Sequence, residues 1–123
     1  MIQYIEGFPD NVVALSGKGQ VTKADYEQVV IPKTEAALRL HPKIRLYYEL
    51  GPEFSGLDAG AAWEDFKVGM EHRTRWERMA IVTDVDWIRN MVNVVRFLIP
   101  GHLRVFGTKQ AEEAKVWLLS QTA

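Results

Sequence analysis

Five side chains with oxygen donors follow two apolar runs of the sequence, and they are the residues best placed to do chemistry. They are Glu53, Ser55, Asp58, Asp84 and Asp86. If the two runs are parallel strands, their carboxyl ends lie at one edge of a sheet and these side chains converge there. A group of carboxylates suits Mg²⁺. The three aspartates also stand where helix N-caps belong, and capping accounts for all of them. We therefore expect no metal site.

The other residues offer few candidates for a catalytic nucleophile or a metal ligand. The chain has no cysteine, and none of His41, His72 and His102 has a second histidine three or four residues away, as helical zinc ligands have. Ser55, His72 and Asp84 could be combined into a triad, but no Gly-x-Ser-x-Gly run supports one. A glycine-rich phosphate-binding run is also missing. The sequence therefore predicts a protein that is not an enzyme, with no catalytic residue, cofactor or metal.

Length and charge limit the class of protein further. The 123 residues suit one domain, residues 1–123. The 15 Lys and Arg residues nearly balance the 16 Asp and Glu residues, whereas a nucleic-acid binder normally carries a basic excess. The N-terminal residues do not resemble a signal peptide, and the densest apolar stretch, residues 91–99, is too short to span a bilayer. We expect a cytoplasmic protein with no transmembrane segment and no nucleic-acid partner.

An alternation of strands and helices must position these residues. Apolar runs predict strands at residues 2–5, 12–15, 44–50, 79–83 and 103–106. Helical spacing of apolar residues predicts four helices, at residues 22–40, 59–70, about 86–98 and 108–118. This order predicts an α/β fold with a mixed five-stranded sheet, mostly parallel, whose first strand is an antiparallel edge strand.

Turn and cap residues give more local expectations. Glycine, proline and serine make residues 51–58 a predicted loop. Thr22 followed by Asp25 predicts a capping box, and Pro32 inside the first helix predicts a kink. A cap is also expected from Asp84 or Asp86 on the third helix. Three tryptophans at inward helix positions are expected in the core: Trp63, Trp87 and Trp117.

The third predicted helix is more apolar than a helix that covers a sheet needs to be. Its polar residues fall within an arc of roughly 120°, whereas a stripe of about 100° suffices to cover a sheet. Part of the apolar surface is therefore expected to face a neighbouring helix, a partner protein, a second copy of the chain or an apolar ligand. The candidate interface residues are Ile88, Met91, Val92, Val95 and Ile99.

Several segments, in order along nearly the whole chain, resemble one known family. They are EGFPDNVV at 6–13, GKGQVTKADY at 17–26, KIRLYY at 43–48, FSG at 54–56, WEDFK at 63–67 and MAIVTD at 79–84. On these segments the chain resembles the SpoIIAA-like proteins, STAS-fold relatives of the bacterial anti-sigma-factor antagonists.

The resemblance implies a single STAS-type domain of a bacterial protein, with a non-catalytic regulatory role and a protein partner. In the antagonists a kinase phosphorylates a serine at the start of the second helix. Ser55 occupies that region and is the candidate phosphoswitch, because a helix N-terminus stabilises phosphate. The candidate ligand or partner loop comprises Glu53, Phe54, Gly56, Asp58 and Asp84. The STAS fold also resembles the lipid-carrying SEC14 type in topology, so the alternative function is binding of a small apolar ligand or lipid.

Overall fold

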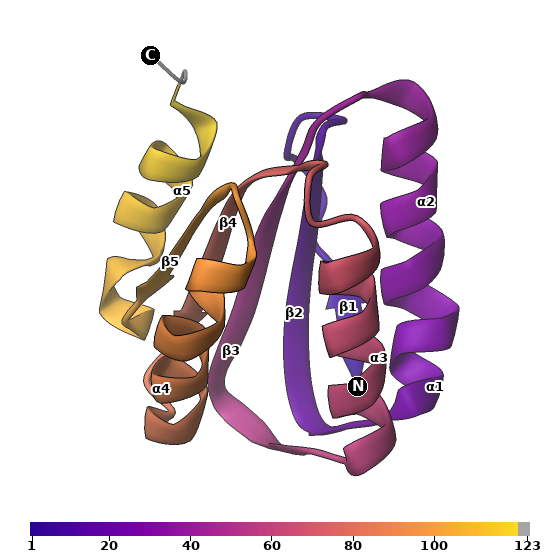
Figure 1. Ribbon diagram of the computed structural model, residues 1–123. Helices are drawn as coiled ribbons and strands as arrows, with labels where there is room; N and C mark the ends of the chain where they lie inside the picture. Colours follow the sequence, from indigo (N-terminus) through magenta and orange to yellow (C-terminus); the bar gives the residue numbers. More distant parts are fainter. Residues whose placement is uncertain (121–123) are drawn as a thin grey trace.

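A computed structural model describes residues 1–120, which form a five-stranded sheet with helices on both faces (Figure 1). The strands are β1 (Ile2–Tyr4), β2 (Val12–Val21), β3 (Ile44–Leu57), β4 (Trp76–Thr83) and β5 (His102–Phe106). They lie in the order β1-β2-β3-β4-β5, with β1 antiparallel to β2 and every other pair parallel. The predicted α/β fold, with its antiparallel edge strand, is confirmed.

The four predicted helical segments are all present. They comprise α1 (Lys23–Asp25), η1 (Tyr26–Val30) and α2 (Ile31–Leu40); α3 (Ala59–Glu71); α4 (Asp86–Val95) and η2 (Arg96–Leu98); and η3 (Thr108–Gln110) and α5 (Ala111–Leu119). Because the parallel strands follow one another across the sheet, right-handed crossovers place α2, α3 and α4 on one face. Figure 1 shows α2 and α3 together on one side of the sheet and α5 on the other.

The first helical segment begins as predicted. The backbone N–H of Thr22 donates to Asp25 Oδ2 at 2.8 Å, and the Asp25 N–H donates back to the Thr22 hydroxyl, which completes the capping box. Ahead of Pro32 the segment passes through η1, a π-helical turn in which the Ile31 N–H bonds to the Tyr26 carbonyl. Such turns are a recognised cause of helix irregularity.

The prediction of a loop at residues 51–58 is wrong for most of that segment. Strand β3 continues to Leu57, and Phe54 lies opposite Gly19 of β2. The register of β2 shifts on both sides of Gly19, whose φ of +59° suits a residue without a Cβ atom. The glycines and the proline of the segment therefore accompany a bent strand pair rather than end it.

Two clusters of buried side chains make the core, one on each face of the sheet. Val13, Leu15 and Tyr48 belong to the cluster under α2, α3 and α4. Val12 and Tyr47 belong to the cluster under α5. Alternate residues of β2 and β3 thus point to opposite faces, and both faces are buried.

The tryptophan predictions hold only in part. Trp63 and Trp87 are 59% and 49% exposed, contrary to the prediction that they lie in the core, and Trp117 is half-buried. Trp76, at the start of β4, is buried instead. The two exposed side chains stand on α3 and α4, where the helices leave space above the sheet.

Candidate functional site

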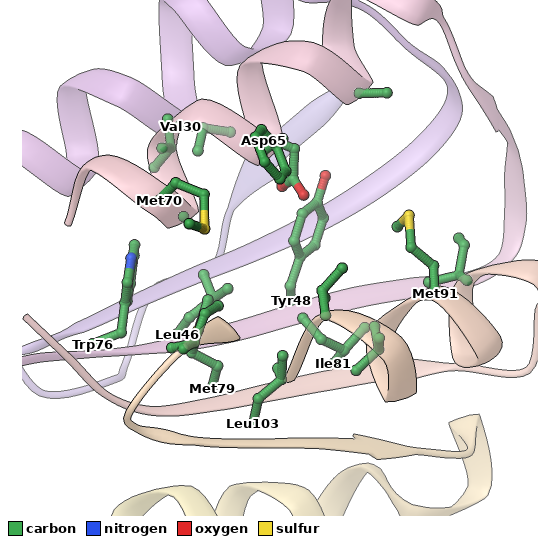
Figure 2. A pocket seen from close by; sticks show the side chains of 18 of the residues that line it. Val30, Leu46, Tyr48, Asp65, Met70, Trp76, Met79, Ile81, Met91 and Leu103 are labelled. Atoms are coloured by element: carbon green, nitrogen blue, oxygen red, sulfur yellow. The ribbon is translucent and has the colours of Figure 1, made fainter. Parts of the chain in front are cut away.

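A cavity of about 170 Å³ lies between the sheet and the helices α3 and α4 (Figure 2). Its floor is made by side chains of β3, β4 and β5: Leu46, Tyr48, Met79, Ile81 and Leu103. Figure 2 shows Trp76 and Met70 at one end of the cavity and Met91 toward the other. The lining is almost entirely apolar, as in sites for small organic ligands.

Small residues on α3 make room for this cavity. Ala62 and Gly69 line it, and a Cβ atom built on Gly69 would meet no other atom within 4 Å. The helix is fixed elsewhere, because Ala61 is fully buried and the Asp58 carboxylate accepts the Ala61 N–H at 2.6 Å. The helix therefore packs into the core at its start and leaves space above the sheet further along.

The cavity opens to solvent between α3 and α4. Phe66 of α3 and Trp87 and Met91 of α4 line it, and these side chains are 48%, 49% and 40% exposed. An engineered cavity of roughly 150 Å³ with apolar walls stays dry and binds benzene. The cavity of this protein could therefore hold a single ring or a short chain, and a longer ligand could extend through its mouth.

Three hydrogen-bonded polar side chains interrupt the apolar lining, which also includes the Thr34 hydroxyl and Trp76 Nε1, two buried atoms without a hydrogen-bond partner among the described residues. The Tyr26 hydroxyl donates to Asp65 Oδ1 at 2.8 Å and lies 3.0 Å from the Tyr48 hydroxyl. Because the single hydroxyl hydrogen of Tyr26 is directed to the carboxylate, Tyr48 must be the donor to Tyr26. The result is a chain of hydrogen bonds from Tyr48 through Tyr26 to Asp65. Figure 2 shows Asp65 next to the hydroxyl end of Tyr48.

The surroundings shift the pKa of each group in this chain upward. Burial raises the pKa of the Asp65 carboxyl, although the hydrogen bond from Tyr26 opposes the shift. The residue is nevertheless exposed to solvent. Burial and the nearby Asp65 charge raise the pKa of both phenols, that of Tyr26 well above its ordinary value of 10.0. Both phenols therefore keep their protons at neutral pH.

The predicted ligand or partner loop does not form a single polar cluster. Ser55 and Glu53 are exposed on β3, and Glu53 pairs with Lys18 at 3.4 Å. Phe54 packs against the core, and Gly56 lies opposite Gln20 of β2. Within residues 1–120, no three histidine, aspartate or glutamate side chains are grouped so that they could hold a metal ion.

Of the aspartate caps predicted for α3 and α4, only the cap on α3 is present. Asp58 caps α3 through the Ala61 N–H, as expected. Helix α4 has Val85 at its N-cap with no side-chain cap bond, so the prediction that Asp84 or Asp86 caps it is wrong. Asp84 instead accepts the Thr108 N–H at 3.0 Å and the Thr108 hydroxyl hydrogen, which ties the end of β4 to η3.

All five candidate interface residues of the third helix line the cavity. Ile88 and Val92 are buried, Val95 and Ile99 are half-buried, and Met91 is exposed. The side chains that point to solvent on this segment include Val94 and Phe97, at 71% and 80% exposed. The wide apolar arc is therefore shared among the sheet, the cavity and solvent.

The hydrogen-bonded polar residues of the cavity, Tyr26, Tyr48 and Asp65, are not among the residues predicted from the sequence. Tyr26 and Tyr48 stand near apolar residues in the sequence, and no local pattern pairs them with Asp65. A signal for Asp65 does exist, because helical periodicity places it on the same face of α3 as Ala62 and Gly69. A carboxylate on a face of small apolar residues indicates a role other than solvation.

Comparison with known proteins supports the fold. A family model described as SpoIIAA-like matches residues 12–119. The chain is also similar to the crystal structure of an uncharacterized protein of the DUF3478 family, with a SpoIIAA-like fold, from Shewanella loihica PV-4, at 28% identity and a TM-score of 0.72. That match covers 96% of this chain and 92% of the other. A search of curated proteins finds no match.

A membrane-spanning helix is not found among residues 1–120, since none of their helices is both long and apolar enough. The family model covers most of the chain, and the similar crystal structure has a SpoIIAA-like fold. The chain belongs to the SpoIIAA-like family.

Proposed function

We propose that this protein is a non-catalytic binding module whose cavity takes a small apolar ligand. The observation that carries the proposal is the open apolar cavity between the sheet and the helices α3 and α4. Apolar walls gain free energy when they exchange water for an apolar ligand, and the gain is roughly proportional to the area covered. The exposed aromatic rim at Phe66 and Trp87 supports the same function, because these side chains would be covered by a ligand that fills the mouth.

The four methionines allow a direct test of this function. Met70, Met79 and Met91 line the cavity, whereas Met1 is exposed beside β1. With ¹³C-labelled methionine methyl groups, titration with propylbenzene should shift the three cavity signals and leave the Met1 signal in place. Saturating propylbenzene without a shift at Met70 and Met79 would refute the proposal.

A matched pair of variants checks where the probe binds. Ala62→Phe places a ring on the cavity wall and should abolish the shifts. Ala36→Phe makes the same change at an exposed position of α2 and should preserve them. Native mass spectrometry of the protein, gently purified from its own host, would then show whether a releasable organic molecule is already bound.

The exposed end of the α4 segment favours a second function, the binding of a regulatory partner protein. Val94 and Phe97 lie outside the cavity lining and are largely exposed, and large apolar side chains in such positions often mark protein contacts. A photoreactive phenylalanine analogue at position 97 should form an adduct in the host cell. The same analogue at Val116 of α5, also 71% exposed, is the control. An adduct of doubled mass would assign this surface to a second copy of the chain.

The candidate phosphoswitch at Ser55 belongs to this second function. The side chain is exposed on β3, three residues before the α3 cap at Asp58. Two added negative charges would lie between Glu53 and Asp58, and they would change the local potential sharply. Ser55→Asp should therefore alter capture of the partner identified through position 97, and unchanged capture would exclude the switch.

A further inference from the structure

The cavity wall carries one carboxylate in an otherwise uncharged lining. Of the described residues that line the cavity, Asp65 alone has a side chain that can carry a negative charge, and no lysine, arginine or histidine accompanies it. None of the ion pairs found among residues 1–120 involves Asp65. Asp65 is exposed, so a ligand that covers its carboxylate would remove it from solvent, and this is costly unless the ligand brings a cation or hydrogen bonds that compensate for the lost water.

The hydrogen bonds of this protein compensate for that charge only in part. Tyr26 donates one hydrogen bond to Oδ1, and Oδ2 has no partner among the described residues. The hydroxyl hydrogen of Tyr48 is directed to Tyr26 rather than to the cavity. Both phenol hydrogens are therefore committed, and this part of the wall offers hydrogen-bond acceptors but no free O–H donor. A ligand group that meets it must bring its own hydrogens.

We infer that the cavity is built for an amphipathic amine, whose ammonium group pairs with Asp65 while its apolar part lies on Leu46, Met79 and Ile81. This inference rests on the proposed binding function and names the class of ligand. An ammonium group supplies the positive charge that the wall lacks and donors for the free acceptor atom of Asp65. A carboxylic acid would bring a second negative charge, and an alcohol would leave the charge of Asp65 without a counter-ion.

Two probes of similar shape distinguish the contribution of the apolar cavity to binding affinity from that of the Asp65 charge. Phenethylamine carries an ammonium group where propylbenzene has a methyl group. In the methionine-methyl titration at pH 7, Asp65→Asn should weaken the binding of phenethylamine by about 10- to 100-fold, the usual range for one charged hydrogen-bonded contact. The same variant should weaken propylbenzene binding far less, because propylbenzene has no charge to pair with Asp65, so the ratio of the two affinities reports the ion pair.

A second pair of measurements makes the result specific. Asp10→Asn removes a carboxylate at an exposed position outside the cavity and should change neither affinity. The anionic probe 3-phenylpropionate should bind more weakly than phenethylamine, and Asp65→Asn should strengthen its binding.

The outcomes separate this inference from the function on which it rests. One outcome is that propylbenzene binds, and that phenethylamine has the same affinity for Asp65→Asn as for the unmodified protein. This outcome would overturn the inference of an amine ligand but would leave the proposed binding of apolar ligands intact. Tighter binding of 3-phenylpropionate than of phenethylamine would overturn it in the same way. If neither probe shifts Met70 and Met79, both the proposed function and the amine fail.

Discussion

The hydroxyl groups of Tyr26 and Tyr48 lie 3.0 Å apart, one from the π-helical turn η1 and the other from the central strand β3. Tyr26 also donates to Asp65 on α3, so its hydroxyl joins the layer of helices to the sheet. The side chain of Tyr26 is fully buried, and its hydroxyl is the middle member of the chain. The contact therefore links three elements that are far apart in sequence.

The two tyrosines are expected to differ in their effect on stability. Tyr48→Phe removes one hydrogen bond and should lower the free energy of unfolding by about 1 kcal/mol. Tyr26→Phe leaves both the Tyr48 hydroxyl and the Asp65 carboxylate without their partner, and should cost about 2–3 kcal/mol. Urea unfolding of both variants, with Tyr4→Phe on the exposed edge strand as control, measures the difference. Equal losses would contradict the central position of Tyr26 in the chain.

Asp65→Asn is expected to raise the melting temperature at pH 7. Burial raises the folded-state pKa of Asp65 above the ordinary value of 3.8, so the folded protein binds the proton more tightly than the unfolded chain. Ionisation of Asp65 therefore lowers the free energy of unfolding. This loss is absent below pH 3.8, grows as the pH rises to the folded-state pKa, and is complete above that pKa.

Calorimetry of this variant across pH checks the sign. The gain in melting temperature should be a few degrees at most, because solvent reaches the residue, and it should vanish below pH 3.8. A gain of the same size at acidic and neutral pH would show that charge is not its cause. The Asp10→Asn control should give no gain at either pH.

Arg45 is expected to hold the C-terminal helix to the sheet. Its Nε donates to Glu77 Oε1 at 2.6 Å, and its Nη1 donates to the carbonyl oxygens of Leu118 and Ser120. Arg45→Lys keeps the charge but loses the planar arrangement of donors, and should cost about 2 kcal/mol. Hydrogen exchange should become faster in α5, whereas Arg39→Lys on the exposed face of α2 should leave it unchanged. Unchanged protection of α5 in Arg45→Lys would contradict this role.

Gly101 is expected to tolerate no side chain. A Cβ atom there would lie 2.1 Å from the carbonyl oxygen of Trp76, so the backbone at the start of β5 would have to move away from β4. Gly101→Ala should therefore destabilise the protein by more than about 2 kcal/mol in urea unfolding. At Gly51 an added Cβ atom meets nothing within 4 Å, and Gly51→Ala should be close to neutral. Equal stability of the two variants would refute the close approach at Gly101.

Local patterns in the sequence were sufficient for most of the fold. The dense apolar runs of β3 and β4 and the capping box at Thr22 depend on neighbouring residues, so they can be recognised without a structure. The strand from Gly51 to Leu57 could not be recognised from the sequence, because its pairing depends on the register shift in β2 at Gly19. A pairing partner 35 residues away leaves no local trace in composition.

The site was harder to predict than the fold for the same reason. The apolar excess of the third helix was visible, and its predicted residues do line the cavity. The exposure of Trp63 and Trp87, however, depends on how α3 and α4 pack in the folded protein, which no helical pattern encodes. The partnership of Asp65 with Tyr26 likewise spans 39 residues.

The π-helical turn η1 also preserves the rotational phase of the helix that follows it. Each residue of an α-helix advances the side-chain direction by about 100°, so one extra residue in a regular helix would redirect every later side chain, whereas a wide turn takes up that residue locally. Val30, Thr34 and Ala37 all face the core from η1 and α2. Deleting one residue from η1 should therefore close the wide turn into an ordinary α-helical turn and leave the buried stripe of α2 facing the core.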